Sequence, residues 1–350
     1  MPTRKITIRG LAALFALSGL AVASYAWADT PMSYMRTYGP AGYPVTQLNW
    51  GVTAISVLVS VIIGLLVLWA VFRRRPPAQL DQQGRLPLAR EPGGLKWIYI
   101  GVGITVLVLI GVTTWNAVTL AAVSQPQQEP AFTVVITAHQ WWWEARYPNE
   151  DPTQSFVTAN EIHIPVGKPV VFKLQSADVI HSFWIPRLGG KTDLIPGQTT
   201  MTWLQADQAG VYRGQCGEYC GAQHAHMVMH VVAEEQARFD TWRAAQLAGA
   251  AQPRNVAALQ GREVFNMNCS VCHTVRDSMH STMAQGKLGP DLTHLMIRDM
   301  IAAGLLKNSR GSLHGWIANP QELKPGSRMP RIPMSPQKLH ELVAYLEALK

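Results

Sequence analysis

The sequence predicts a membrane protein of three parts: a pair of transmembrane helices, an all-β domain and an all-α domain. Only 15% of the 350 residues are charged, against roughly 25% in an average soluble domain. Two long apolar runs explain much of this deficit, and beyond residue 125 the pattern changes from short β-type runs to helical periodicity. The length is sufficient for two or three domains, each with its own core.

The first 28 residues have the layout of an export signal. Basic residues near the N-terminus precede an apolar run over 11–23, and small residues follow it. This order predicts a signal peptide over 1–28 that is cleaved near Asp29. A retained first helix is the less favoured alternative, because the apolar run is short for a span of about 20 residues.

Two further apolar runs are long enough to cross a bilayer. They cover 50–72 and 97–122, and neither contains a charged residue. We expect them to form a two-span hairpin within 45–125. Buried helices of a soluble core are disfavoured, because they would need charge-free stretches of unusual length.

The connector between the two spans predicts the topology of the chain. Over 73–96 it carries six Lys and Arg residues against two acidic ones, and such an excess marks the cytoplasmic side. The rest of the mature chain then lies on the periplasmic or extracellular side of a bacterial-type inner membrane. This topology explains much of the net charge of +8, so a nucleic-acid partner is not expected.

The exported part divides into two domains. Residues 126–247 contain short β-type runs separated by Pro and Gly, which predicts a sandwich or barrel, closed by a helix over 234–247. Residues 248–255 form the expected linker. From 256 to 350 the pattern is helical. The β runs are 132–136, 162–164, 169–174 and 227–232, and the helices are expected over 256–266, 313–318 and 335–349.

Two of the four cysteines lie in a loop rich in soft metal ligands. Cys216, Cys220, His224 and Met227 occur within twelve residues, and thiolates with imidazole suit copper in a cupredoxin-like β domain. Two thiolates at this spacing can bridge two metal ions, and His181 is the best candidate for a second imidazole. A disulfide or a single zinc ion are the alternatives for the same thiols.

Four motifs, in order, closely resemble subunit II of haem-copper cytochrome c oxidases. They are HQWWWEARY over 139–147, VIHSF over 179–183, KTDLIPG over 191–197 and GQCGEYCGAQHAHM over 214–227. The resemblance covers roughly 45–235. It implies the dinuclear copper centre CuA, in which Cys216 and Cys220 bridge the coppers and His181 and His224 bind one copper each.

The same resemblance implies three further roles. Met227 is the weak ligand of one copper, and the backbone carbonyl of Glu218 serves the other. The Glu218 side chain would face a magnesium site shared with the catalytic subunit. Trp141 occupies the family position over the copper site at which electrons arrive.

The second cysteine pair has the spacing of a haem attachment site. Cys269-Ser-Val-Cys272-His273 is a C-x-x-C-H motif, in which the thiols form thioether bonds and His273 binds the iron. A redox dithiol or zinc is disfavoured, because the pair follows a helix.

The second axial ligand should be a Met or His downstream. Residues 319–330 resemble the methionine loop of class I cytochromes c, which favours Met329 and then Met334; the other candidates are His280, His294, Met296, Met300, His314 and His340.

The fused arrangement resembles subunit II of caa-type oxidases. It implies a transmembrane hairpin, a cupredoxin-like Greek-key barrel and a class I cytochrome c domain. It also implies that electrons pass from haem c to CuA and then to haem in subunit I, where oxygen is reduced to water with coupled proton pumping. The expected partners are subunit I, subunit III, membrane lipid, and cytochrome c or a cytochrome bc complex as donor; no catalytic residue is expected in this chain.

Two alternatives stay open at this point. A CuA-containing nitric oxide reductase shares this domain plan, and a membrane-anchored electron carrier would need no oxidase partner. One departure from the family concerns protons. Lys96 and Trp97 stand at the start of the second span, where many members have a proton-channel glutamate, and Glu91 is a poor substitute.

Overall fold

The computed structural model describes residues 30–74, 94–276 and 284–350. The expected signal peptide, most of the basic connector with Glu91, and the candidate ligand His280 lie outside these ranges. The chain forms two compact units, of which one is 44–125 and the other combines the segment up to Tyr43 with 126–350.

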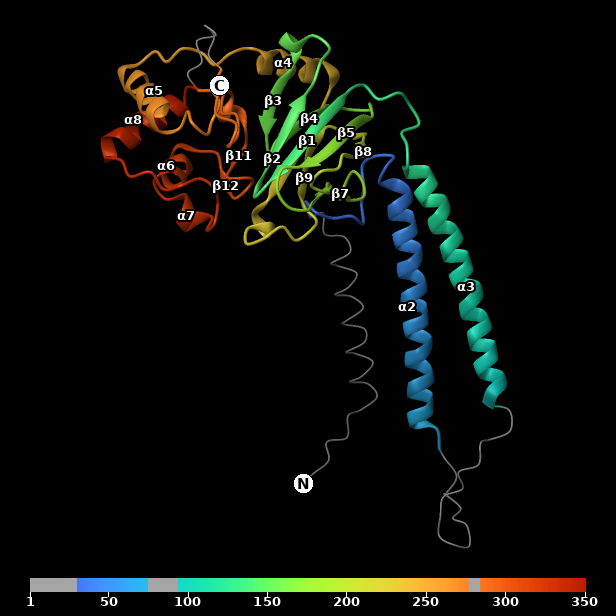
Figure 1. The fold of residues 1–350 in the computed structure, drawn as a ribbon. Helices are drawn as coiled ribbons and strands as arrows, with labels where there is room; N and C mark the ends of the chain where they lie inside the picture. Colours follow the sequence, from blue (N-terminus) through green and yellow to red (C-terminus); the bar gives the residue numbers. More distant parts are fainter. Residues whose placement is uncertain (1–29, 75–93, 277–283) are drawn as a thin grey trace, which may run out of the picture. The chain divides into compact units, whose positions relative to one another are not determined.

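The first unit is a pair of long apolar helices (Figure 1). Helix α2 covers Tyr43–Phe72 and α3 covers Gly94–Val123, with 30 residues each. At 1.5 Å per residue each helix is about 45 Å long, which exceeds a hydrocarbon core of about 30 Å. Both extend beyond the expected spans, because the residues that flank the apolar runs continue the helical hydrogen bonding.

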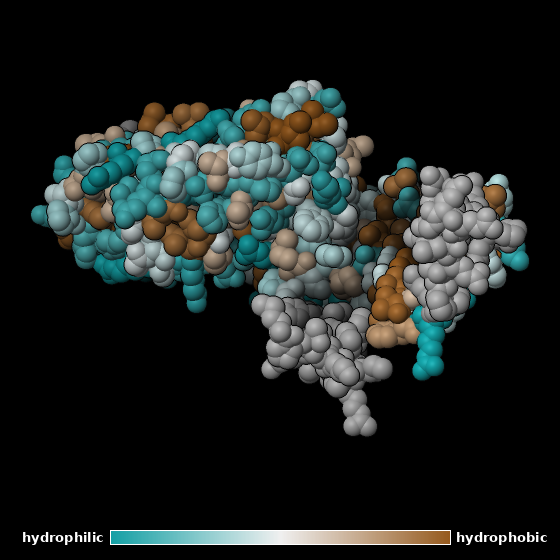
Figure 2. All heavy atoms as spheres, turned by 90° about the horizontal axis from the view of Figure 1, so that it is seen from below, coloured by the Kyte–Doolittle hydropathy of each residue, from teal (hydrophilic) through white to brown (hydrophobic). Residues whose placement is uncertain are grey.

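Close packing between these helices depends on a glycine. A Cβ atom at Gly51 would lie 2.4 Å from Cη2 of Trp115, so only glycine lets the indole contact the α2 backbone, as small residues do in membrane helix pairs. Most other side chains of the pair are exposed and apolar, and Figure 2 shows hydrophobic residues gathered on these helices. A bilayer is the solvent that suits such a surface.

The β domain consists of two five-stranded sheets, with orders β3-β2-β1-β5-β8 and β4-β10-β9-β6-β7. Strands β1 and β5 pair in parallel, as do β4 and β10, whereas the other neighbours pair antiparallel. This arrangement confirms the cupredoxin-like fold. The bounds are β1 Thr133–His139, β2 Trp142–Tyr147, β3 Phe156–Ala159, β4 Glu161–Pro165, β5 Val170–Ser176, β6 His181–Trp184, β7 Thr192–Leu194, β8 Thr200–Leu204, β9 Gly210–Cys216 and β10 Val228–Glu234.

Strand alternation builds the core of this domain. Burial in β1 alternates residue by residue, since successive side chains of a strand point to opposite faces. The inward residues of both sheets meet in one cluster that includes Trp143, Phe172 and Phe183. Helix α4, over Gln236–Leu247, closes one end by stacking Phe239 on Phe132 with ring centroids 5.3 Å apart.

Strand register brings two predicted ligands together. His181 is the first residue of β6, and Cys216 is the last residue of β9. These strands are neighbours, with Phe183 opposite Cys216. The loop between β9 and β10 holds the remaining candidates, including the short 3-10 helix η2 at His224–His226. The metal-binding loop therefore lies at one end of the second sheet.

The helical domain covers the C-terminal part of the chain. Its helices are α5 Val256–Asn268, α6 Arg310–Ala318, α7 Pro320–Leu323 and α8 Pro336–Leu346. Side chains of Asn255, Ser309 and Ser335 cap α5, α6 and α8, as short polar residues do at helix starts. Helices α5 and α8 approach closely at Gly261, where a Cβ would lie 1.9 Å from the Glu341 carbonyl oxygen. The small strands β11 (Met300–Ile301) and β12 (Leu306–Lys307) were not expected.

Candidate metal centre

Two buried thiols form the middle of the candidate centre. The Sγ atoms of Cys216 and Cys220 lie 3.7 Å apart, whereas a disulfide requires about 2.05 Å. All four cysteines of the chain lie in described ranges, and each carries a free thiol. The first pair is therefore available for metal binding.

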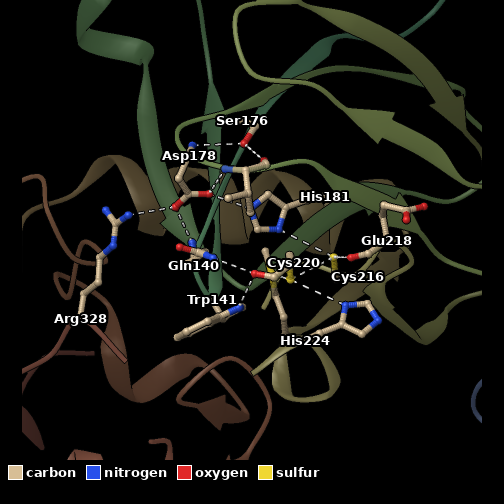
Figure 3. Close-up of polar contacts among 12 residues, drawn as sticks. Gln140, Trp141, Ser176, Asp178, His181, Cys216, Glu218, Cys220, His224 and Arg328 are labelled. Carbon is tan, nitrogen blue, oxygen red and sulfur yellow. Dashed lines mark hydrogen bonds and ion pairs between the residues drawn. The ribbon is translucent and has the colours of Figure 1, made fainter. Parts of the chain in front are cut away.

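One imidazole flanks each thiol (Figure 3). Nδ1 of His181 lies 3.8 Å from Cys216 Sγ, and Nδ1 of His224 lies 3.7 Å from Cys220 Sγ. Two weaker donors complete the set. Met227 Sδ is 3.9 Å from Cys220 Sγ, and the Glu218 carbonyl oxygen is 3.2 Å from Cys216 Sγ.

This donor set fits two metal ions better than one. The ligand atoms of His181, Cys216 and Cys220 lie within 4.8 Å of one another, and among the described residues His224 does not join that group. A single tetrahedral zinc would draw all four ligands to one point at about 2.0 to 2.3 Å. Sulfur in the centre with one imidazole at each end instead matches a copper pair bridged by thiolates.

The two thiols differ in acidity because they share a hydrogen bond. The hydrogen bond between the two sulfur atoms lowers the pKa of the Cys216 thiol, and the same contact together with burial raises the pKa of Cys220. A metal binds thiolates rather than thiols, so loading of the centre releases protons.

Asp178 holds His181 in a ligating orientation, and the sequence-based prediction did not include it. Nε2 of His181 donates to Asp178 Oδ1 at 2.8 Å, which leaves Nδ1 toward the thiol. The backbone N–H of Gln140 donates to the other carboxylate oxygen at 2.8 Å. Burial alone would raise the pKa of Asp178, but these hydrogen bonds hold it at about 2. A carboxylate behind a histidine is the usual outer support of a metal site.

Trp141 and Gln140 both donate to the metal-binding loop. The Trp141 indole Nε1 reaches the Cys220 carbonyl at 3.0 Å, and Gln140 Nε2 reaches the same oxygen at 2.8 Å. Trp141 as a whole is 9% exposed. It lies so close to Gly221 that a Cβ there would be 3.0 Å from the ring, and Gly221 has a φ of +114°. Only glycine suits that position.

A cavity of about 480 Å³, lined mostly by the helical domain, adjoins the second cysteine pair. Its volume lies in the range of small-molecule and cofactor pockets. Cys269, Cys272 and His273 line one part of it. The cavity is lined by residues of both domains, including Trp141, Met300, Lys324, Met329 and Met334.

His273 is prepared to bind a metal through one nitrogen. Its Nδ1 donates to the Pro290 carbonyl at 2.8 Å, which leaves Nε2 without a proton. Burial lowers its pKa, which favours the neutral ring. A Cβ at Gly289 would lie 2.6 Å from the ring, so glycine is needed for the ring to lie here. Two thiols and such an imidazole beside an apolar cavity fit a covalently attached haem.

The candidates for the second axial position differ in their surroundings. Met300, Met329 and Met334 line the cavity. Both ring nitrogens of His294 bond to backbone carbonyls, so it has no free ligand atom. Backbone carbonyls of Met329 and Ser327 accept hydrogen bonds from Gln321 Nε2 at 2.7 Å each, which orders the loop that carries Met329.

Two neighbouring methionines test the thioether donor. Met227→Leu should change the hyperfine pattern of the copper EPR spectrum, because it removes the sulfur 3.9 Å from Cys220 while keeping the side chain apolar. Met229→Leu is the matched control, since Met229 is buried in the core and packs near Gly214. Equal spectra for the two variants would contradict the role of Met227.

Comparison with known proteins matches each of the two exported domains to a family. Residues 152–234 match the family "Cytochrome C oxidase subunit II, periplasmic domain", which implies copper, and 258–350 match the cytochrome c family, which implies haem. The chain is 37% identical to cytochrome c oxidase subunit 2 of Alkalihalophilus pseudofirmus, covering 88% of this chain and 89% of the relative. It is 30% identical to subunit 2 of Bacillus sp. strain PS3, covering 80% of each. A crystal structure of the periplasmic domain of subunit II from Bradyrhizobium japonicum is 31% identical, with a TM-score of 0.32, and covers 34% of this chain and 95% of that one.

Proposed function

This chain belongs to the cytochrome c oxidase subunit II family, and from that premise we propose that it relays electrons from a covalent haem c to CuA and on to haem in subunit I. Oxygen would be reduced to water in subunit I, with coupled proton pumping. The chain is a membrane-anchored electron-transfer subunit of a terminal oxidase, with its redox domains on the periplasmic side.

We assign the copper pair to the central thiolates and their neighbours. Cys216 and Cys220 would bridge the coppers, with His181 on one and His224 on the other. Met227 and the Glu218 carbonyl would be the weak ligands. The distances of 3.2 to 3.9 Å among these groups support the assignment. Asp178 would keep His181 in the tautomer that offers Nδ1.

The haem would be held in the cavity of the helical domain. Cys269 and Cys272 would form the thioether bonds, His273 would bind the iron through Nε2, and Met329 would be the second axial ligand. When bound, the haem and the copper pair each supply a site that accepts and releases one electron. The mostly apolar lining of the cavity would give the haem surroundings of low polarity, which is one of the factors that set its reduction potential.

The position of Trp141 is the observation that carries the relay proposal. Its side chain lines the cavity of the helical domain and donates a hydrogen bond to the Cys220 carbonyl. One indole therefore contacts both the proposed haem site and the proposed copper site. We propose that electrons cross between the sites along this contact.

Other expected interactions involve the assembled enzyme. We propose subunit I and subunit III as partners, and cytochrome c or a cytochrome bc complex as the donor. We also propose that the Glu218 carboxylate faces a magnesium site shared with subunit I. This carboxylate is exposed and lies 3.4 Å from Lys191 Nζ. The Glu218 carboxylate points away from the two thiols in Figure 3, so a cation that a neighbouring subunit holds there would not compete with copper.

The relay can be tested in the full chain loaded with copper and haem. The haem is first reduced by a rapid photochemical pulse. The haem should then be reoxidised at the same rate as the absorbance of the copper pair bleaches, because each electron that leaves the haem arrives at the copper pair. Trp141→Phe should slow this step by about tenfold or more, because it removes the hydrogen bond to Cys220 and part of the ring contact.

A matched aromatic variant controls this experiment. Trp242 stacks on His163 with ring centroids 4.0 Å apart, and Trp242→Phe should leave the rate unchanged. Absence of copper bleaching in the wild-type chain would refute the relay. A Trp141→Phe rate equal to that of the wild type would refute only the route through Trp141.

A further inference from the structure

Lys324 is a buried cation between the two exported domains. It follows helix α7 directly and is only 3% exposed. Its Nζ donates to three backbone carbonyls: Trp141 at 2.9 Å, His226 at 2.8 Å and Ala302 at 2.9 Å. Trp141 and His226 belong to the β domain, whereas Ala302 belongs to the helical domain.

The number of acceptors matches a charged lysine. An ammonium group has three protons and no acceptor, and here each proton has one carbonyl. Burial lowers the pKa of Lys324 to about 7, and the nearby Cys220 acts in the opposite direction. The three short contacts favour the charged form, because a neutral amine would leave one carbonyl without a donor.

Two acceptors of Lys324 connect it to the metal-binding loop between β9 and β10. The backbone oxygen of Trp141 accepts a hydrogen bond from Lys324, and the indole N–H of Trp141 donates a hydrogen bond to the Cys220 carbonyl. His226 is adjacent to Met227. The lysine therefore connects the helical domain to the metal-binding loop at His226 and to Trp141, without a hydrogen bond to any proposed copper ligand.

Weaker contacts surround this point. The Val228 N–H donates to the Ala303 carbonyl at 3.0 Å, and Gln223 Nε2 donates to the Pro325 carbonyl at 2.8 Å. Arg328 pairs with Asp178 at 3.4 Å, but its side chain is 63% exposed, and exposed pairs contribute little. Among these contacts, Lys324 is the buried charged one, and removing a buried charge-assisted donor has the largest cost.

We propose that Lys324 is a positioning residue for the electron relay, which locks the helical domain onto the copper loop so that electrons cross without domain movement. This inference rests on the proposed relay for its kinetic consequence. Its structural part, a single docked arrangement that depends on Lys324, stands independently of the relay.

The test uses the full chain in detergent, loaded with copper and haem. Pulsed dipolar EPR between the oxidised haem iron and the copper pair should give one narrow distance distribution in the wild type. Lys324→Met keeps an unbranched side chain of similar length but removes the three N–H donors and the positive charge. It should broaden that distribution, lower the haem-to-copper rate by about tenfold or more, and make the rate depend on solvent viscosity. The copper EPR and haem absorption spectra should not change.

Two further variants make the result decisive. Lys338→Met removes an exposed lysine of the same domain and should match the wild type in both distance and rate. Lys324→Gln keeps two N–H donors without the charge, so its distance distribution and its haem-to-copper rate should be intermediate. If Lys324→Met loses the copper EPR spectrum or the haem absorption spectrum, Lys324→Gln serves as the test of the lock. Wild-type distance and rate in the Lys324 variants would overturn the lock. A narrow wild-type distance that broadens in Lys324→Met, without electron arrival at copper, would support the lock and refute the relay.

Discussion

Replacing Cys220 by Ser is expected to abolish the two-copper EPR signal and to lower electron delivery to subunit I by at least about a hundredfold. Loss of an outer support alone costs 10- to 100-fold in metal affinity, and Cys220 would be a bridging ligand. Its sulfur lies 3.7 to 3.9 Å from Cys216, His224 and Met227. A serine hydroxyl stays protonated at neutral pH and is a hard donor, so it cannot replace a thiolate between coppers.

The reciprocal variant is the control for this experiment. Cys272→Ser should weaken haem attachment while the copper signal persists, because the two cysteine pairs lie in different domains. Cys220→Ser should in turn retain the haem spectrum. A two-copper signal that survives in Cys220→Ser would contradict the bridging role, and one zinc per chain in the wild type would contradict the copper assignment.

Replacing Met329 by Leu should convert the haem to a form with His273 as its only protein ligand. Axial ligands set haem potentials over a wide range, and a methionine raises them. Loss of the thioether should therefore lower the reduction potential of the haem by at least about 100 mV. The measurement is a redox titration of the haem absorption in the full chain, together with its spin state.

Met334→Leu is the matched variant, because Met334 also lines the cavity and follows Met329 by five residues. It should leave the potential and the spin state unchanged. The opposite pattern, with a large effect of Met334→Leu and none of Met329→Leu, would move the axial ligand to Met334. The hydrogen bond from Gln321 to the Met329 carbonyl favours an ordered position for Met329.

The sequence was most informative where chemistry depends on local spacing. The C-x-x-C-H motif and the Cys216–Met227 loop could be identified without a structure, because attachment and ligation require particular residue types a few positions apart. The membrane spans were equally accessible, since length and absence of charge suffice. Helix limits were less accurate, as α2 begins at Tyr43 rather than near Trp50.

Residues that contact the candidate ligands without being ligands themselves could not be predicted in this way. Asp178 stands three residues before His181, but a carboxylate at that spacing is common and carries no specific signal. Its 2.8 Å contact with His181 is visible only in the tertiary structure. The strands β11 and β12 were missed because two-residue strands have no periodicity to detect.

The sequence by itself determined the family, the kinds of cofactor and the residues that are candidates to bind them, because ligand type and covalent attachment are properties of short segments. Only the tertiary structure decided how the two sites are joined. The contact between Lys324 and Trp141 links residues 183 positions apart. Such a contact depends on how two separately folded domains pack, and no local pattern of residues encodes that packing.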